Sequence, residues 1–548
     1  METNEPIREG EGPPPLPSTM APDPAEIERR VQQSARWVGR GTTIMVASTI
    51  VLLAAGLVAR IAAARALPVA VWGSFNLGVS FTSLLSVVIL LGLNQAVARS
   101  LAYEHDDVER HAIVRWSLIV STVISTVASI LTFVFAVPLA GVFHDPTLVG
   151  ILQLLAISVG MGAITPVYAA IFQGFHNVVP NAVFNQIVNP LLFAVFTVGL
   201  VYFGFGLLGC IVAYVIADVA GLVGIMIYYH RRIGRYLPSL PAARRFPHPR
   251  LWSLSVALWG VASLAFVTAF ADTLILGAYW PALQVGYYST AMTLARVLLL
   301  GGSALTYVTL PVASRLAREK AYPELGLTYV TATRWTLFLS FPLLLLFGLL
   351  PQLTIKELFT AKYLPAAFPL QFLVVTAFLS TAFGPVNATL AGLGKKANQA
   401  TSALVSATTN VILSFSLIPI YGVLGAAIAW GVARALYPAL GLSLLNREFG
   451  IHPFRAILLK PLAVSLAIGV PIFLAIRFLP TPGWAIFPLF FGATAIYALS
   501  LLLTKSLARG DFTLIEMVER VVGRPFPKLR AFLEPYVSTA TVSTVPRG

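Results

Sequence analysis

Residues Ala271 to Ala317 read ADTLILGAYWPALQVGYYSTAMTLARVLLLGGSALTYVTLPVASRLA, and they give the clearest indication of the fold class. Two apolar runs are joined by a short turn at residues 280–284, and a basic segment follows them. A helix needs about 20 apolar residues to cross a bilayer core of roughly 30 Å. The stretch therefore predicts a hairpin of two membrane-spanning helices. Each helix carries one ionisable residue, Asp272 in the first and Arg296 in the second.

The composition of the whole chain supports a membrane protein. Of its 548 residues, 57% are hydrophobic and 11% are charged, whereas soluble domains carry about 25% charged residues. The formal net charge of +15 does not indicate nucleic-acid binding, because the basic residues are spread over short loops between apolar runs rather than gathered in one patch. The single cysteine, Cys210, excludes a disulfide within the chain.

Apolar runs recur along the chain at lengths that suit membrane helices. They predict an all-α integral membrane protein with about fourteen transmembrane helices. The expected spans are 41–66, 70–94, 112–140, 147–172, 179–203, 205–229, 251–279, 283–310, 325–350, 365–390, 397–419, 422–445, 461–479 and 484–505.

The distribution of Lys and Arg predicts the orientation of these spans. Most of the 37 basic residues fall in the two terminal segments and in alternate loops. The opposite side holds Arg60, Arg65, Lys356, Lys362 and Arg477 at most. Because short positively charged loops stay in the cytoplasm, we expect both termini to be cytoplasmic and the protein to lie in the cytoplasmic membrane.

Internal similarities predict two related six-helix lobes. The basic segment 230–250, with six arginines and four prolines, divides the first twelve spans equally. Residues 72–75 (WGSF) resemble 285–288 (VGYY), and residues 206–209 (GLLG) resemble 422–425 (GVLG), in the same order. Two lobes in parallel repeat would surround a central cavity.

This repeat sets the expected domain boundaries. They are a cytoplasmic tail with an interfacial helix (1–40), an N-terminal six-helix lobe (41–229), a basic cytoplasmic linker (230–250), a C-terminal six-helix lobe (251–446), two extra transmembrane helices (447–505) and a cytoplasmic tail (506–548).

Enzyme chemistry is not expected from this sequence. No pair of histidines has the spacing of metal ligands on a helix, and no Gly-rich phosphate loop followed by Lys-Ser or Lys-Thr occurs. The loops expected outside the cell are too short for an active-site domain. We therefore expect no cofactor and no metal site.

Ionisable side chains inside the spans are the main functional signal. A charge in the hydrocarbon layer costs several kcal/mol unless it faces a cavity or a partner. Arginine outnumbers aspartate among them, and guanidinium groups bind phosphate as bidentate donors. An anionic substrate is therefore predicted, whereas a cavity for cationic drugs would carry the opposite sign. The residues are Arg60, Asp218, Asp272, Arg296, Arg334 and Arg434.

Structural roles remain open for both aspartates. Asp272 could pair with Arg296 across the hairpin, and Asp218 could pair with Arg434 across the lobes. Either aspartate could instead couple a proton or a sodium ion.

The remaining intramembrane polar residues also have two interpretations. Arg60 and Arg334 could extend to the membrane interfaces or face the cavity. The amides of Asn185, Asn189 and Asn410 could line a hydrated cavity, or could form hydrogen bonds between helices.

The chain resembles the polysaccharide-biosynthesis transporters, the lipid-linked oligosaccharide flippases of the superfamily that includes multidrug and toxin extruders. The resemblance covers roughly residues 38–445. It rests on Asp272 with Leu276-Gly277, Val285 to Ala291 (VGYYSTA), Pro311 to Leu316 (PVASRL), Ala391 to Lys395 (AGLGK), Asn410, and Ile418 to Ala427 (IPIYGVLGAA).

This resemblance implies export of a polyprenyl-diphosphate-linked oligosaccharide. Two lobes, surrounded by membrane lipids, would rock around a central cationic cavity. Arg60 and Arg296 would hold the diphosphate, and Asp218 or Asp272 would couple a proton or sodium ion. Glycan polymerases and glycosyltransferases are candidate partner proteins. The alternatives are a lipid II-type flippase, a cation-coupled drug extruder and a non-transporting scaffold for glycan synthesis.

Overall fold

The computed structural model describes residues 24–233, 250–453, 486–503 and 526–536, with a few single positions between 463 and 519. These residues form helices joined by short turns, and no strand occurs among them, which confirms the all-α membrane class. Ten helices in this part of the chain are long and apolar enough to cross a membrane. The predicted span 461–479 lies outside the described ranges except for isolated positions.

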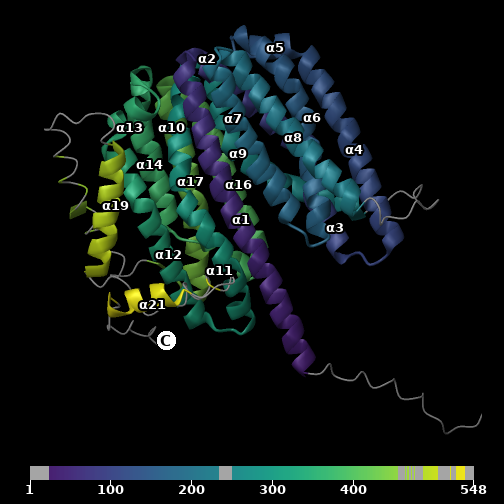
Figure 1. Ribbon diagram of the computed structural model, residues 1–548, viewed down its shortest axis with the longest axis vertical. Helices are drawn as coiled ribbons and strands as arrows, with labels where there is room; N and C mark the ends of the chain where they lie inside the picture. Colours follow the sequence, from purple (N-terminus) through teal and green to yellow (C-terminus); the bar gives the residue numbers. More distant parts are fainter. Residues whose placement is uncertain are drawn as a thin grey trace, which may run out of the picture.

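The first half of the chain builds a compact group of helices (Figure 1). It comprises α1 (Pro24–Ala66), α2 (Val69–Ile89), α3 (Leu93–Tyr103), α4 (Asp107–Val134), α5 (Ala136–Val142), α6 (Thr147–Gly174), the π-helix η1 (Asn181–Val188), α7 (Asn189–Tyr202) and α8 (Gly206–Arg232).

The second half forms another group. It comprises α9 (Arg250–Tyr279), α10 (Ala282–Leu298), α11 (Leu300–Arg318), α12 (Tyr322–Leu344), η3 (Leu345–Leu349), α13 (Pro351–Leu358), η4 (Ala361–Ala366), α14 (Ala367–Ala382), α15 (Val386–Gly392), α16 (Lys396–Tyr421) and α17 (Val423–Phe449). Later described elements are α19 (Ile486–Leu503), α21 (Pro527–Leu533) and η7 (Glu534–Tyr536).

The first helix is longer than the sequence predicted. The tail 1–40 was expected to contain a separate interfacial helix, but α1 is continuous from Pro24 to Ala66. No proline interrupts it between Pro24 at its first turn and Pro68 just beyond its end, and proline is the strongest breaker of a helix interior.

Four predicted spans are broken rather than continuous. The span 70–94 divides into α2 and α3, the span 112–140 into α4 and α5, the span 283–310 into α10 and α11, and the span 365–390 into α14 and α15. At the first break Gly92 has a φ of 71°, and a Cβ there would lie 2.5 Å from the main-chain oxygen of Ser255 in α9. Glycine therefore allows both the left-handed turn and the close approach of α3 to α9.

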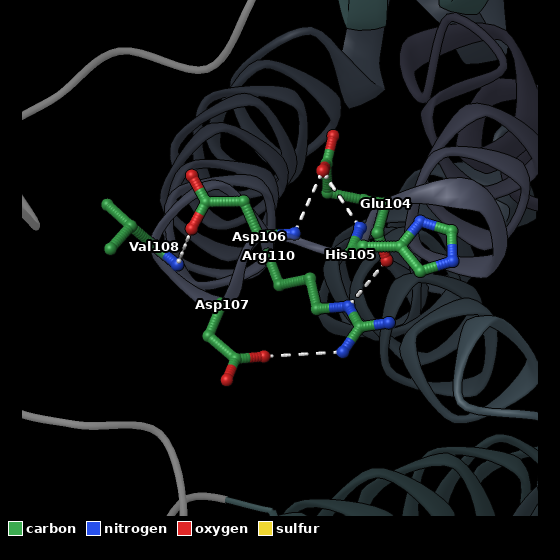
Figure 2. Close-up of polar contacts among 6 residues, drawn as sticks. All are labelled: Glu104, His105, Asp106, Asp107, Val108 and Arg110. Carbon is green, nitrogen blue, oxygen red and sulfur yellow. Dashed lines mark hydrogen bonds and ion pairs between the residues drawn. The ribbon is translucent and has the colours of Figure 1, made fainter. Parts of the chain in front are cut away.

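Local polar contacts fix the turn from α3 into α4 (Figure 2). The Glu104 carboxylate accepts hydrogen bonds from the main-chain amides of His105 and Asp106, at 2.9 and 3.0 Å. Asp106 caps α4 by accepting from the amide of Val108 at 3.0 Å. Arg110 donates to the Glu104 carbonyl at 2.7 Å. The cap satisfies an amide that the first turn of the helix leaves without a partner.

Buried apolar residues show how the two groups of helices meet. One cluster, here called the shared core, joins Trp72 and Phe75 of α2 to Tyr288 of α10 and Tyr363 of η4. The other end of the molecule has two separate clusters. One is built on α3, α4, α6 and α8 with the start of α9, and the other on α11, α12, α15 and α17. The halves thus share one core at one end, whereas at the other end they have two clusters and the start of α9 is the part of the second half that packs on the first.

Hydrogen bonds reinforce the shared core at the turn between α1 and α2, near the top of Figure 1. Lys362 Nζ donates to the carbonyls of Arg65 and Leu67, at 3.0 and 2.6 Å. The Tyr363 hydroxyl donates to the Ala64 carbonyl at 2.9 Å. Arg65 in turn donates to a carbonyl at the end of α13 at 2.8 Å. Main-chain groups of the first half are therefore bound by side chains of the second.

Two glycines bring α2 and α10 into backbone contact beside this turn. A Cβ at Gly73 would lie 1.8 Å from the Ala282 oxygen, and a Cβ at Gly286 would lie 2.3 Å from the Val69 oxygen. These are the glycines of the WGSF and VGYY segments that suggested an internal repeat.

Replacing Gly73 with alanine should force these helices apart. We expect a loss of about 1–3 kcal/mol in stability from overpacking, measured as a lower melting temperature of the purified protein. Gly199→Ala in α7 is the matched control, because nothing lies within 4 Å of a Cβ there. Alanine has a better helix propensity than glycine, so the melting temperature of Gly199→Ala should equal or exceed that of the wild type. Equal melting temperatures for the two variants would contradict the close packing.

Candidate functional site

A cavity of about 480 Å³ lies among α10, α11, α12, α14, α15 and α17, with Leu53 of α1 on its border. This volume is in the range of small-ligand sites, about 300–1,000 Å³. The charged residues among those that line it are Arg296 and Arg434, and no Asp or Glu is among these described lining residues. The cavity is therefore cationic.

Arg296 occupies the last turn of α10, directly before the break at Leu299. Its Nη2 donates to the carbonyl of Ala269 in α9 at 3.1 Å, and the side chain is half-buried. A cation in the last turn of a helix is stabilised by the carbonyl ends of the peptide dipoles. The break in the predicted span thus places this arginine at the cavity wall.

Asp272 lies behind Arg296 and is fully buried in α9. One carboxylate oxygen accepts a hydrogen bond from the hydroxyl of Tyr288, which is also buried. The other oxygen, Oδ1, has no hydrogen-bond partner among the described residues. Asp272 and Arg296 interact electrostatically, although the described part of the chain contains no direct ion pair between them. The predicted pairing is therefore an attraction at longer range.

Arg434 on α17 is the second cation of the cavity wall. Its side chain is exposed to the cavity and interacts electrostatically with Arg296 and Tyr437. The suggested ion pair between Arg434 and Asp218 is wrong for this structure. Asp218 instead accepts a hydrogen bond from Asn189 Nδ2 at 2.9 Å, because α8 packs on η1 and α7 of its own half.

A polar cluster in the first half surrounds the π-helix η1. Gln186 Oε1 accepts from the hydroxyl of Ser48 in α1 at 2.6 Å, and Asn189 holds Asp218 of α8. The amide of Asn185 donates to the asparagine one turn earlier in η1 at 2.8 Å. A π-helix of this kind is often found at functional sites. Asn185 and Asn189 therefore belong to this cluster, and neither is among the residues that line the cavity.

The other predicted site residues also lie outside the cavity lining. Arg60 of α1 is half-buried and interacts electrostatically with Tyr214 and Arg296. Arg334 is buried within α12, at 1% exposure. Asn410 is fully buried in α16, and neither of its amide atoms has a hydrogen-bond partner among the described residues. Of the predicted site residues, the cavity brings together Arg296 and Arg434.

Sequence reasoning did not identify the uncharged polar residues of the wall. They are Thr306, Thr336, Ser380, Thr381, Asn387 and Tyr437. Two signals were available. Gly384-Pro385 inside an apolar run marks the helix break just before Asn387, and Tyr437 follows Arg434 by about one helical turn.

The Tyr288–Asp272 contact should matter for stability. Tyr288→Phe removes the hydroxyl and leaves a buried carboxylate without its donor. We expect a loss of about 1–3 kcal/mol, seen as a lower melting temperature. Tyr287→Phe at the adjacent, half-buried position is the control and should unfold like the wild type. Tyr288→Phe with an unchanged melting temperature would argue against this hydrogen bond.

Some known proteins are similar to this chain in sequence, and others are similar to it in fold. An uncharacterised membrane protein of Methanocaldococcus jannaschii is 26% identical over 385 residues, which are 65% of this chain and 73% of the relative. The lipid II flippase MurJ, in an inward closed conformation, superposes with a TM-score of 0.69 at 14% identity, over 84% of this chain and 98% of that one. An inward-facing multidrug resistance MATE transporter of the MOP superfamily gives 0.61 at 15% identity, over 75% and 98%.

At these identities the two structural similarities establish a shared fold. The family match is more direct, because the model of the polysaccharide biosynthesis protein family covers residues 62–368, more than half of the chain. The protein therefore belongs to the polysaccharide biosynthesis protein family.

Proposed function

We propose that this protein is a flippase that moves a polyprenyl-diphosphate-linked oligosaccharide from the inner to the outer leaflet of the cytoplasmic membrane. The observation that carries the proposal is the cavity whose charged lining residues are Arg296 and Arg434. Two guanidinium groups without a lining carboxylate attract a diphosphate and repel a cationic drug. The family's role in polysaccharide biosynthesis supports a glycan as the transported group.

The proposed transport cycle follows from the positions of the buried cores. In our proposal both termini are cytoplasmic, and residues 41–229 and 251–446 act as two lobes. The end that contains the α1–α2 turn then faces outward, where the shared core and the bonds of Lys362 hold the lobes together. The inner end has two cores, and the start of α9 in the second lobe packs on the core of the first. Transport requires the shared core to part while these two inner cores approach each other.

We assign different roles to the two intramembrane aspartates. Asp218 has a neutral amide, that of Asn189, rather than a cation as its hydrogen-bond partner. A proton or a sodium ion can therefore supply the positive charge that its carboxylate lacks. Asp272 lies close to the cavity arginines and interacts with Arg296. Its negative charge offsets the repulsion that Arg296 experiences from Arg434. In this proposal Asp218 couples the ion, and Asp272 holds Arg296 in place.

The alternative functions fit the cavity unequally. A lipid II-type precursor carries the same diphosphate, so Arg296 and Arg434 suit it equally well, and the similarity of fold to a lipid II flippase keeps it as the second candidate. A drug extruder for cations is disfavoured by the sign of the charge. A non-transporting scaffold would have a dry interior, which a cavity of about 480 Å³ does not support.

Transfer between leaflets tests the proposal directly. The protein is reconstituted in vesicles that contain a fluorescent polyprenyl-diphosphate glycan, and the fraction of probe in each leaflet is followed with time. Arg296→Ala and Arg434→Ala should each slow transfer by about tenfold or more, since a hydrogen bond to a charged group contributes about 1.5–3 kcal/mol.

Arg318→Ala, at the exposed end of α11, is the matched control and should retain wild-type transfer. The same assay with a fluorescent lipid II tests the second candidate. Transfer of the glycan lipid at the wild-type rate by both cavity variants would contradict the assigned site. Failure of the wild type to move either lipid would contradict the flippase proposal itself.

A further inference from the structure

The wall of the cavity carries the aromatic ring of Tyr437 near the cationic side chain of Arg434. Arg434 and Tyr437 both line the cavity and lie three residues apart on α17. Side chains with this spacing project from the same face of a helix, with Cβ atoms about 5–6 Å apart. Tyr437 is half-buried, and it is the aromatic residue among the described lining residues. A group attached directly to a phosphate at Arg434 would therefore lie beside this ring.

A second polar group, Asn387, is held at the wall by a rigid break in the chain. Gly384 at the break between α14 and α15 has a φ of 67°, and a Cβ there would lie 1.9 Å from Thr333 Oγ1 of α12. The Tyr329 hydroxyl donates to the Phe383 carbonyl that the break leaves exposed. These contacts fix the start of α15 and with it the position of Asn387.

The side-chain amide of Asn387 lies close to the neighbouring α17. Its Oδ1 is buried without a partner among the described residues, 3.8 Å from where a Cβ of Gly441 would lie. The other end of the amide, Nδ2, is therefore the group available to the cavity. Gly441 makes this close packing possible, because a Cβ there would lie 2.7 Å from a methyl carbon of Val386. The wall thus offers a hydrogen-bond donor that a ligand can use.

These two groups match the chemistry of a neutral sugar. A pyranose ring has an apolar face of C–H groups, which packs on an aromatic ring, and an edge of hydroxyls, which accept and donate hydrogen bonds. Hydroxyls of Ser380, Thr381 and Thr336 complete the uncharged wall. No lining carboxylate is present among the described residues to pair with an amino group on a ligand.

We propose that Tyr437 and Asn387 recognise the first sugar of the substrate, the one bonded to the diphosphate, while Arg296 and Arg434 bind the diphosphate. This inference rests on the proposed lipid-diphosphate function and adds which part of the substrate the protein recognises. Tyr437 supplies the surface for the sugar ring, and Asn387 donates to one of its oxygens. In this proposal these residues do not contact the sugars farther from the diphosphate.

Binding of two ligands to the full-length protein in lipid nanodiscs separates the sugar from the diphosphate. The first probe is unglycosylated polyprenyl diphosphate. The second is a set of polyprenyl diphosphates that carry one hexose or one N-acetylhexosamine. We expect the wild type to bind at least one single-sugar lipid more tightly than the unglycosylated lipid.

The variants should divide by the part of the ligand that they contact. Tyr437→Leu and Asn387→Leu should each weaken binding of the best single-sugar lipid by about tenfold and change binding of the unglycosylated lipid little. Tyr437→Phe keeps the ring and should retain most of the preference for the sugar. Arg434→Gln should weaken binding of both lipids by the same factor.

The outcomes distinguish this inference from the function on which it rests. If the wild type binds neither lipid, the lipid-diphosphate proposal fails. If it binds both equally, or if Tyr437→Leu and Asn387→Leu weaken both lipids alike, sugar recognition by these residues is overturned while the diphosphate site stands. Melting temperatures of all variants, measured on the same samples, identify a loss of binding that comes from unfolding.

Discussion

Backbone contact between α2 and α10 is the constraint on which the rest of the structure depends. Gly73 and Gly286 allow the two helices to touch without intervening side chains, and small residues permit such close packing inside membranes. The contact lies beside the turn that Lys362 and Tyr363 bind. Because the halves are joined there, the shared core forms at one end and a polar cavity is left deeper in the molecule.

Mutual repulsion of cations shapes this cavity. Arg296 interacts unfavourably with Arg60 and Arg434, and in a medium of low dielectric constant such repulsion is strong. The negative charge of Asp272 offsets this repulsion. Asp272 is buried behind the cavity wall and accepts a hydrogen bond from Tyr288. The end of α10 adds its carbonyl dipoles. An anionic ligand would relieve the remaining repulsion, which supports the phosphate-bearing substrate that we propose.

Part of the site could be predicted from the sequence, and the reasons for success and failure are physical. Arg296 and Arg434 were identified because a charge in an apolar run is costly without a functional partner. Asn387 and Tyr437 were not identified, because polar uncharged residues are common in such runs and their direction depends on helix rotation. The pairing of Asp218 with Arg434, one of the alternatives that the sequence left open, assumed a contact across the two lobes. It did not account for Asn189, which lies on a neighbouring helix of the same half.

The all-α membrane class, the approximate position of most spans and the excess of intramembrane arginine were all evident in the amino-acid sequence. These properties follow from the length and composition of apolar runs, which act locally. Helix packing, in contrast, sets where the spans break and which arginines share a cavity. It also placed Asp272 behind Arg296 rather than in contact with it. Those features depend on the rotation and packing of helices distant in the chain, and hydropathy carries no information about either.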